Sequence, residues 1–524
     1  MRIEDLLRRN ARRSATSTAI VCNEGSLTWA ELDAASDRLA SALLARGYRQ
    51  HERIAVVLPN CHRIPIAYYA IWKCNMVSVA INPRLTAAEV RRILEHSGAS
   101  AVICDGPAAV EAAAQVPTVR EVIGVSPMSG ATTSLEELDD VPAGLVPAVG
   151  SGSDLRSLRY TSGTTGQPKG CMATHEQQLA SVSNFLIEVE VPRTAPTYLS
   201  VPMTLGVGAF YLTAAAYLAA PLVVRQKFRP QEFLADVERF GIAHAFLVPT
   251  MLIDLVNELE GRSAPFDTSL RLVGYGGAPI SWKVVRAVRD LFGCDLYQGL
   301  GATEAGGYAT LLTPQDHHEL LAEDPEGPVP IGRAAAYART RVVDADRNDV
   351  DPGATGELLI SSASNFSGYW AQPEETAAVL RDGWLALGDV VREDERGFLH
   401  MVDRKQGVIR SGSQNVYAGE VEAVLMTCPG VVRAAAVGMS DERFGESVRA
   451  LVVRAPGSDL DEQAVIDHCT AHLAGYKRPR SVVFVPEIPV DEGGKIQRAR
   501  LAELPELDPA GREPAPADRE SLSS

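Results

Sequence analysis

The sequence predicts an α/β protein, with a large N-terminal domain of parallel-rich sheets covered by helices and a small C-terminal α+β domain. Short apolar runs rich in β-branched residues alternate with amphipathic stretches along most of the 524-residue chain. These runs are apolar throughout, which is typical of strands buried on both faces of a parallel sheet. A segment dense in charges and turn residues, 383–410, interrupts the pattern, and a new alternation begins at Glu420.

Five elements show the alternation most clearly. We expect an amphipathic helix over Ala30–Leu44, followed by strands at Ile54–Leu58 and Ala101–Cys104. A second amphipathic helix is expected over Pro230–Phe240, before a strand at Ala245–Val248. Because strand-like apolar runs alternate with amphipathic helical stretches, the sequence favours βα units over an all-helical or all-β fold.

The interruption divides the chain into three predicted segments. The N-terminal domain is expected over residues 1–405 and the C-terminal domain over 406–506, with a linker near Asp403–Gly407. Residues 507–524 are rich in Pro, Ala, Asp and Ser and show no apolar period, so we expect a disordered tail.

The composition is that of an ordinary globular protein, because 46% of the residues are apolar and 22% are charged. Acidic residues outnumber basic ones by 66 to 50, which gives a formal charge of −16. An acidic surface repels phosphate backbones, so nucleic acid is not expected as a partner. Eight cysteines occur without a CxxC pair, which argues against a zinc site or a disulfide framework and fits a reducing cytoplasm.

No targeting segment or membrane span is expected. Glu4 and Asp5 stand where a signal peptide would carry positive charge. The uncharged stretch Thr194–Val224 contains Pro202 and Pro221, and a buried strand, turn and helix is the expected structure there. We therefore expect a cytoplasmic protein, either a monomer or a homodimer.

The strongest local signal is the segment Tyr160–Gly170, YTSGTTGQPKG. Its glycines allow backbone amides to turn inward, while its hydroxyls and one ammonium offer donors to a polyphosphate. The segment is not a Walker A loop, because Pro168 stands where the second glycine would be. A polar surface loop is the alternative interpretation.

Lysines are rare in this chain, with only seven among its 50 basic residues. A compact ammonium suits a site that must reach one oxygen, whereas arginine forks onto two. Lys169 lies in the Gly-rich loop and Lys495 lies in the segment Glu492–Ile496. Both are candidate site residues, although a solvated surface lysine is the alternative for each of them alone.

Four further motifs follow the loop in order, and they are Gly274–Pro279, Tyr297–Glu304, Leu387–Asp389 and Asp403–Lys405. Together with the loop and Lys495, this ordered set resembles the adenylate-forming superfamily. That superfamily includes acyl- and aryl-CoA synthetases, the adenylation domains of peptide synthetases and beetle luciferases. The likeness extends over nearly the whole chain, from Leu27 to Lys495.

The resemblance implies a site for ATP. The loop residues that would close over the phosphates are Thr161, Ser162, Gly163, Thr164, Thr165, Gly166 and Lys169. Two further groups of residues, each following a predicted strand, would line the nucleotide. They are Gly276, Gly277, Ala278, Gly299, Leu300, Gly301 and Ala302. The resemblance also implies that Thr303 contacts phosphate, that Asp389 binds the ribose hydroxyls and that Arg404 binds the same nucleotide. Glu304 would hold Mg²⁺, with Thr161 as a second metal ligand.

The same resemblance assigns catalytic roles to Lys495, Glu304 and Thr303. Mg²⁺ on Glu304 and the ammonium of Lys495 would neutralise phosphate charge and orient the attacking carboxylate. Attack on the α-phosphate would give an acyl-adenylate and pyrophosphate. A thiol, either that of CoA or a phosphopantetheine, would then open this mixed anhydride to a thioester. The family alternates the two half-reactions by rotating its mobile C-terminal domain about a hinge, which falls here at Gln406.

Three residues depart from the family pattern. Gln406 stands where the hinge usually has Lys or Asp, although the neighbouring Gly407 keeps the backbone free to rotate. Leu300 replaces the aromatic residue that stacks on adenine, which predicts ATP binding weaker by roughly tenfold at most. Leu387 replaces the threonine that usually precedes Gly-Asp.

The acyl pocket that the resemblance implies consists of Thr204, Leu205, Gly206, Gly208, Tyr275, Gly276 and Gly301. Relatives often carry an aromatic residue and a histidine at the positions of Thr204 and Leu205. No aspartate stands here to hold an α-ammonium, so an α-amino acid is disfavoured as substrate. The glycines would leave space for a bulky apolar acid, and tight packing is an equally good explanation of them.

The leading hypothesis is an ATP-dependent carboxylic acid–CoA ligase. One alternative is a stand-alone ligase that loads the phosphopantetheine of a carrier protein, and another is an adenylating enzyme that passes the activated group to a different nucleophile. The last alternative is an ATP-binding regulator without catalysis. The residues that argue against it are the intact Lys169, Glu304, Asp389 and Lys495.

Overall fold

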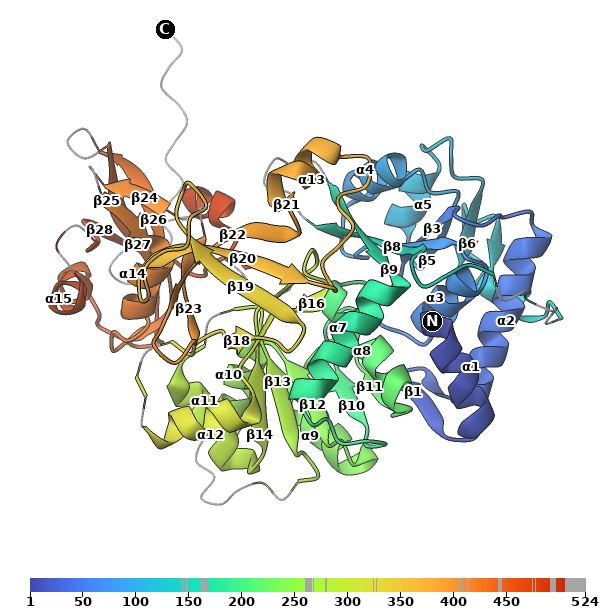
Figure 1. Cartoon of the computed structure of the whole chain (residues 1–524), viewed down its shortest axis with the longest axis horizontal. Coiled ribbons are helices and arrows are strands. Elements are labelled where there is room, and N and C mark those ends of the chain that lie inside the picture. Colours follow the sequence, from blue (N-terminus) through green and yellow to red (C-terminus); the bar gives the residue numbers. More distant parts are fainter. Residues whose placement is uncertain are drawn as a thin grey trace, which may run out of the picture.

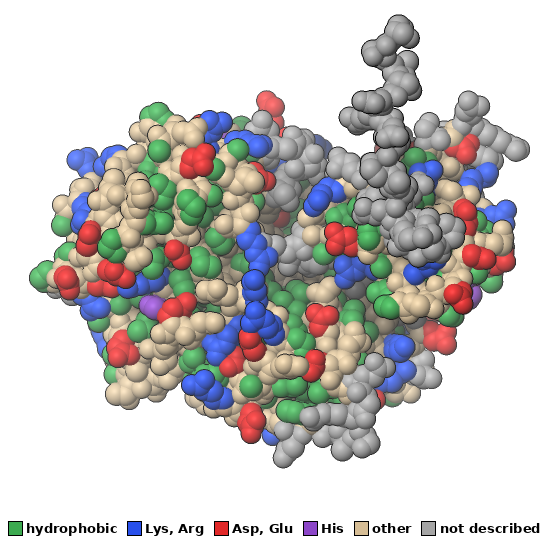
Figure 2. Space-filling model, turned by 180° about the vertical axis from the view of Figure 1, so that it is seen from behind, with side chains coloured by type: hydrophobic (Ala, Val, Ile, Leu, Met, Phe, Trp, Pro, Cys, Tyr) green, Lys and Arg blue, Asp and Glu red, His purple; other side chains and the backbone are tan. Residues whose placement is uncertain are grey.

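The computed structural model describes most of the chain, namely residues 1–142, 144, 146, 149–161, 168–259, 266, 268–278, 280–323, 325–326, 328–404, 408–411, 414–441, 445–473, 475, 477–490 and 496–504. Within these ranges the chain forms two large sheets flanked by helices, an antiparallel sheet beside them and a separate C-terminal sheet (Figure 1). The predicted fold class is confirmed. Acidic and basic side chains are interspersed over the face shown in Figure 2.

Sheet 1 has the strand order β7-β6-β5-β3-β4-β8-β9. Its strands are β3 (Arg53–Val57), β4 (Val77–Ala80), β5 (Ala101–Cys104), β6 (Glu121–Gly124), β7 (Thr133–Ser134), β8 (Leu155–Thr161) and β9 (Lys169–Thr174). All neighbours pair in parallel except β9, which is antiparallel to β8 at the edge.

Helices cover both faces of sheet 1. Ala55 and Val57 pack in one cluster with α4 (Ala87–Ser97) and α5 (Pro107–Ala113). Ile54 and Val56 face the opposite way and pack with α2 (Trp29–Ala45) and α3 (Arg63–Lys73). Successive residues of one strand are therefore buried on opposite sides, which explains why the strand is apolar throughout. A short α6 (Leu135–Asp139) follows β7.

Sheet 2 has the strand order β14-β13-β12-β10-β11-β1-β2. Its strands are β1 (Thr18–Cys22), β2 (Gly25–Thr28), β10 (Thr197–Leu199), β11 (Leu222–Val224), β12 (His244–Leu247), β13 (Leu272–Tyr275) and β14 (Asp295–Gln298). β2 is its antiparallel edge strand. One face packs with α9 (Pro230–Phe240), α10 (Pro249–Glu258) and α11 (Trp282–Phe292).

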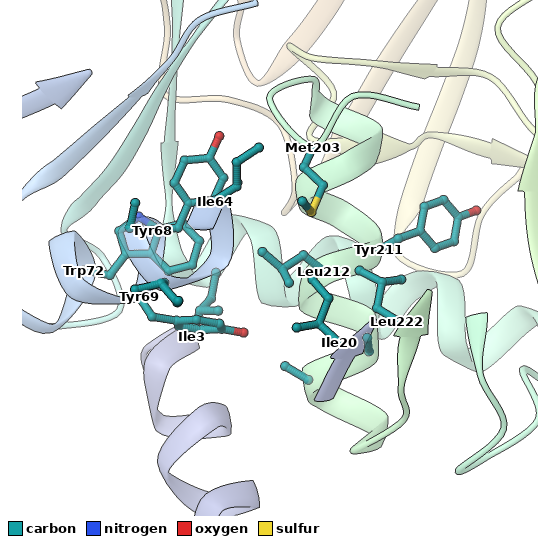
Figure 3. Packing of buried hydrophobic residues seen from close by; sticks show 14 of the residues in the cluster. Ile3, Ile20, Ile64, Tyr68, Tyr69, Trp72, Met203, Tyr211, Leu212 and Leu222 are labelled. Carbon is teal, nitrogen blue, oxygen red and sulfur yellow. The ribbon is translucent and has the colours of Figure 1, made fainter. Parts of the chain in front are cut away.

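The opposite face of sheet 2 shares one core with sheet 1. This core contains residues of α1 (Ile3–Arg13), α3, α7 (His175–Glu188) and α8 (Gly206–Leu218). Figure 3 shows part of it, with Ile3, Tyr69 and Trp72 on one side and Leu212, Ile20 and Leu222 on the other. The two large sheets are therefore held together by a continuous apolar interior.

Sheet 3 is antiparallel and consists of β19 (Ala338–Val343), β20 (Thr355–Ser362), β21 (Leu380–Arg381), β22 (Trp384–Glu393) and β23 (Leu399–Arg404). Two short antiparallel strand pairs precede it, formed by β15 (Gly301–Ala302) with β16 (Gly307–Tyr308) and by β17 (Thr310–Leu311) with β18 (Arg333–Ala334). Two helices accompany these strands, α12 (Pro314–Ala322) and α13 (Pro373–Val379).

The C-terminal sheet has a core of its own. It contains β24 (Val408–Ser411), β25 (Gln414–Tyr417), β26 (Val431–Asp441), β27 (Gly445–Arg454) and β28 (Ser481–Phe484), with helices α14 (Ala418–Leu425) and α15 (Glu462–His472). A 3₁₀ helix at Arg498–Glu503 follows. In Figure 1 these elements lie at the left, beside sheet 3. The domain boundaries stay a prediction, and both the hinge residue Gln406 and the tail 507–524 lie outside the described residues.

The five predicted elements agree with the structure to within one residue at each end. Ala101–Cys104 is β5 and Pro230–Phe240 is α9. The uncharged stretch Thr194–Val224 folds as β10, α8 and β11, and no helix among the described residues is long and apolar enough to cross a bilayer. All eight cysteines are buried and free of disulfides.

Candidate active site

The ends of the Gly-rich loop are fixed by the hairpin of β8 and β9 at the edge of sheet 1. Thr161, the last residue of β8, is opposite Lys169, the first residue of β9. β9 continues into α7, whose first turn is closed by a capping box between Thr174 and Gln177. The loop residues Ser162, Gly163, Thr164, Thr165 and Gly166 lie outside the described residues. The hairpin thus determines where the loop leaves and rejoins the sheet.

Lys169 is held by side chains from a segment about two hundred residues further along the chain. Its Nζ forms an ion pair with Glu375 of α13, and its side chain is only 16% exposed. The same Nζ lies 5.3 Å from the centre of the Tyr369 ring, a cation–π arrangement. The ammonium is therefore confined beside the loop instead of extending into solvent.

Glu304 meets the same tyrosine. Tyr369 Oη donates a hydrogen bond to Glu304 Oε1 at 2.8 Å, and the Phe366 N–H donates to the Glu304 carbonyl oxygen at 2.7 Å. Burial and the adjacent Glu304 carboxylate raise the pKa of Tyr369, so its hydroxyl stays protonated and remains a donor. The predicted metal ligand and the predicted phosphate-binding lysine are therefore linked through Tyr369.

An apolar cluster beneath these groups brings three of the motifs together. Cys171 of β9 and Tyr369 belong to it, and their backbones form an isolated β-bridge. Leu300, Ala302 and Leu387 pack against this cluster. Two of the three residues that depart from the family pattern, Leu300 and Leu387, thus lie against the same small core.

Glycine turns after β13 and β14 form another side of the site. These strands are parallel neighbours, with Tyr275 opposite Gln298, so their carboxyl ends lie at one edge of sheet 2. A Cβ added at Gly276 would lie 3.2 Å from the Gly299 carbonyl oxygen, and one added at Gly299 would lie 2.0 Å from that of Thr310. The two turns therefore touch through their backbones, and ligands in α/β sheets bind at such an edge.

The predicted acyl-pocket glycines differ in the space around them. A Cβ at Gly208 would lie 2.4 Å from Met203 Cα, so this glycine serves tight packing and leaves no room for an acid. Gly206, the first residue of α8, is more open, with Thr303 Oγ1 3.6 Å from the Cβ position. Of the two explanations offered for these glycines, tight packing therefore applies at Gly208.

Three other pocket residues are more enclosed. Thr204 is buried and Leu205 is half-buried. Tyr275 is wholly buried in the core of sheet 2, and its hydroxyl lies 2.7 Å from His317 Nε2. The side chain of Tyr275 therefore packs the core, and only the turn that follows it faces the site edge. Gly301 lies in the β15–β16 hairpin, where a Cβ would be 3.0 Å from the Gly307 carbonyl oxygen.

The predicted ribose ligand Asp389 lies on β22 of sheet 3. Its side chain is buried, and its strand partner across the sheet is Arg404 of β23. The two residues that the resemblance assigns to the same nucleotide are therefore direct neighbours in the sheet. Lys495 lies outside the described residues, so its position stays a prediction.

The residues present fit a magnesium ion that is shared with a nucleotide. Among the described residues, no cluster of three or more His, Cys, Asp or Glu side chains could enclose a metal by itself. Mg²⁺ usually binds one or two carboxylates and takes its other ligands from water and substrate phosphates. Glu304 would supply such a carboxylate, and a nucleotide bound beside the Thr161–Lys169 hairpin would supply the phosphate oxygens.

Sequence reasoning missed Tyr369, Glu375 and Arg159. Tyr369 and Glu375 follow the Gly-rich loop by about two hundred residues, and no spacing rule connects them to it. The one signal was the aromatic pair in Ser367-Gly368-Tyr369-Trp370, which stands out in a chain with 6% aromatic residues. Arg159 directly precedes the loop motif, yet the sequence alone does not reveal that its side chain is buried.

Three features together are typical of a nucleotide-binding enzyme. They are a Gly-rich segment that joins two strands at the edge of one sheet, glycine turns at the carboxyl edge of another, and a carboxylate beside them. Residues 7–370 match the family described as AMP-binding enzyme, and residues 420–495 match the AMP-binding enzyme C-terminal domain. The chain therefore belongs to the AMP-binding enzyme family, which confirms its predicted membership of the adenylate-forming superfamily.

Relatives with known names cover nearly the whole chain. It is 33% identical over 500 residues to a feruloyl-CoA synthase from Amycolatopsis sp, covering 94% of this chain and 97% of the relative. It is 31% identical to the fatty acid–[acyl-carrier-protein] ligase ScoC of Streptomyces coeruleorubidus, covering 94% of each. The solved structure of ATP-bound MatB from Rhodopseudomonas palustris has a TM-score of 0.85 at 26% identity, covering 96% of this chain and 99% of that one. These relatives confirm the predicted class, an adenylate-forming ligase.

Proposed function

We propose that this protein is an AMP-forming acid–thiol ligase that joins a carboxylic acid to CoA with ATP and Mg²⁺. The observation that carries the proposal is the convergence of Glu304, Tyr369 and Lys169 at the ends of the Gly-rich loop. An enzyme that activates a carboxylate must neutralise a triphosphate where the acid attacks it. A carboxylate for the metal and an ammonium for the phosphates, fixed through one tyrosine, meet that need.

The first half-reaction forms the acyl-adenylate. The amides of the Gly-rich loop and the Lys169 ammonium bind the β- and γ-phosphates, and Asp389 holds the ribose. Bound at Glu304, Mg²⁺ would supply a further positive charge to the phosphates. Lys495 bridges the acid carboxylate and the α-phosphate, so that the carboxylate oxygen attacks phosphorus in line with the departing pyrophosphate.

The second half-reaction transfers the acyl group to the thiol. Sulfur attacks the carbonyl carbon of the mixed anhydride, the thiol gives up its proton, and AMP leaves. Rotation of the C-terminal domain about Gln406 replaces Lys495 with the groups that this step needs. The acid is proposed to be an aryl or other bulky apolar acid, for which the 33% identical feruloyl-CoA synthase is the supporting relative. A cytoplasmic location is proposed because all eight cysteines are free thiols.

A panel of acids tests this function. Ferulate, indoleacetate, benzoate and fatty acids of several lengths are each incubated with ATP and Mg²⁺, with and without CoA, while pyrophosphate and AMP are measured. We expect pyrophosphate release that depends on the acid and stops when EDTA removes Mg²⁺, and AMP release that CoA accelerates. Failure of every acid to release pyrophosphate would favour the regulator without catalysis.

A carrier protein is the second candidate acceptor, because a fatty acid–[acyl-carrier-protein] ligase is 31% identical over 94% of the chain. The same assay with a phosphopantetheinylated carrier in place of CoA separates the two acceptors. We expect faster AMP release with CoA. Faster release with the carrier would assign the enzyme to carrier loading.

A further inference from the structure

Strand β8 carries two buried arginines beside the site. Arg156 is 1% exposed and Arg159 is 4% exposed. Both donate to one acceptor on α7, Gln178 Oε1, at 3.0 and 2.7 Å respectively. A shared, neutral amide oxygen does not balance two buried positive charges, which are costly unless they are paired.

The surroundings of the two arginines differ. The Arg156 guanidinium lies 4.8 Å from the centre of the Trp72 ring, and the carboxylate of Glu4 also acts on it. Arg159 forms no ion pair with an acidic side chain in the described part of the chain. The ionisable groups nearest to it are the phenol of Tyr68 and the thiol of Cys171, both buried. A phenol and a thiol that are buried are neutral at neutral pH. Arg159 therefore lacks a counterion from the described protein.

Arg159 faces the open glycine of the predicted acyl pocket. Its Nη1 lies 3.9 Å from the Cβ position at Gly206, and Thr303 Oγ1 lies 3.6 Å from the same point. Gly206 begins the 13-residue helix α8, and the residue before it, Leu205, provides no side-chain cap. The guanidinium, the predicted phosphate ligand Thr303 and the positive end of a helix therefore border one small region.

Two buried hydroxyls near this region also lack partners. Tyr68 Oη and Thr204 Oγ1 have no hydrogen-bond partner among the described residues, and the two residues are 2% and 5% exposed. Figure 3 shows the Tyr68 hydroxyl turned away from Trp72 and Tyr69. Thr204 precedes the start of α8 by two residues. Buried donors without an acceptor are rare in folded proteins, and a bound anion would accept from them.

We propose that Arg159 binds the carboxylate of the acid substrate at the N-terminal end of α8, beside Thr303, and orients it for attack on the α-phosphate. This assignment rests on the proposed function, because that function brings a carboxylate to the side of the nucleotide. Relatives often carry a histidine at the position of Leu205. In this chain Arg159, on strand β8 of sheet 1, would supply the positive charge in its place.

Binding measurements with matched ligands test the assignment. Benzoate, ferulate, indoleacetate and octanoate are compared with their uncharged carboxamides by calorimetric titration of the full chain. Mg²⁺ and α,β-methylene-ATP are present, because that nucleotide fills the site and cannot be split at the α-phosphate. We expect the wild-type protein to prefer at least one acid over its amide, and R159Q to lose that preference roughly ten- to hundredfold, since a charge-assisted hydrogen bond is removed. Affinity for the amide and for the nucleotide should not change.

Arg156→Gln is the matched control, since it removes the other hydrogen bond to Gln178 on the same strand. It should keep the preference for acid over amide even if its Tm falls. If the R156Q and R159Q variants lost the preference for acid over amide equally, both arginines would serve only the fold. If R159Q does not fold, R159K takes its place, because lysine keeps the charge on a different head group. The R159K variant should raise the KM for the acid without raising the KM for ATP.

Other outcomes overturn the assignment. A loss of nucleotide affinity in R159Q would place the guanidinium on a phosphate. A wild-type protein that binds no acid better than its amide would also overturn it. If the binding preference is lost in R159Q but no acid ever releases pyrophosphate from the wild type, then the proposed function fails while the anion site stands.

Discussion

Sheets 1 and 2 have similar architectures but contribute to the site in different ways. Within the described residues each has seven strands, parallel except for one antiparallel edge strand. Sheet 1 meets the site at its antiparallel edge and contributes charged side chains, Lys169 and Arg159. Sheet 2 meets it at the carboxyl ends of β13 and β14 and contributes turns whose backbones touch at Gly276 and Gly299. One side of the site thus depends on charge and the other on backbone shape.

This difference predicts two kinds of mutational effect. Removing the Lys169 ammonium from the sheet 1 side should lower activity while the fold survives, because a partly exposed charge adds little to stability. Adding a methyl group on the sheet 2 side should disturb the fold itself, because a close backbone contact cannot yield without a shift.

The largest effect is expected from Lys495, to which the proposed function gives the bridging role. Lys495→Ala should slow adenylate formation by at least about 10²–10³-fold, the usual result of losing one preorganised electrostatic group. Thioester formation from acyl-adenylate that is supplied ready-made should stay at the wild-type rate. Pyrophosphate release measures the first step and thioester yield the second. Lys477→Ala, in the same C-terminal region and paired with Glu420, is the control. Adenylate formation at the wild-type rate in K495A would rule out the bridging role.

On the sheet 1 side, Lys169→Met should reduce kcat/KM for ATP by roughly ten- to hundredfold, because a charge-assisted contact contributes about 1.5–3 kcal/mol. Its Tm should change little. Glu375→Gln removes the ion pair but keeps the ammonium, so its loss of activity should be smaller. If K169M lost Tm and kept its affinity for ATP, the lysine would be structural.

On the sheet 2 side, Gly299→Ala should destabilise the protein by about 1–3 kcal/mol, the typical cost of overpacking. The added Cβ would lie 2.0 Å from the Thr310 carbonyl oxygen, so the turn must shift. Gly475→Ala is the control, because its Cβ would meet nothing within 4 Å. Denaturant unfolding gives the free energy of unfolding of both variants. A wild-type value in G299A would show that the turn is more adaptable than its contacts indicate.

The smallest effect is expected where the two sides meet. Leu300→Tyr restores the aromatic residue that the family usually has, and a stacked ring adds about 0.5–1.5 kcal/mol. ATP affinity should therefore rise by roughly tenfold at most. Leu387→Thr restores the other family residue on the same apolar cluster without offering a ring, so it should not improve ATP binding. An L300Y protein with weaker ATP binding would mean that the cluster, not the adenine, occupies that position.

The sequence predicted five elements of the two large sheets well because the predicted strands are short and apolar throughout and the predicted helices are amphipathic. Ala101–Cys104 shows this most clearly, since periodicity and burial agree along its length. The Gly-rich loop and the Thr303-Glu304 pair could be identified because their spacing is local. Tyr369 and Glu375 could not, since their contacts with Glu304 and Lys169 arise only from tertiary packing. Arg159 illustrates the same limit, because a sequence does not tell which arginine lacks a counterion.

The burial of the cysteines has a consequence for an enzyme that handles a thiol substrate. Exchange between a thiol and a disulfide begins with attack by the thiolate, and burial raises the pKa of Cys61, Cys104 and Cys469 to about 11. Burial and Glu304 raise that of Cys171 beside the site as well. Almost none of these sulfurs is ionised at neutral pH, and none of the eight is exposed. We therefore expect the protein to resist mixed-disulfide formation in high concentrations of CoA and its oxidised forms.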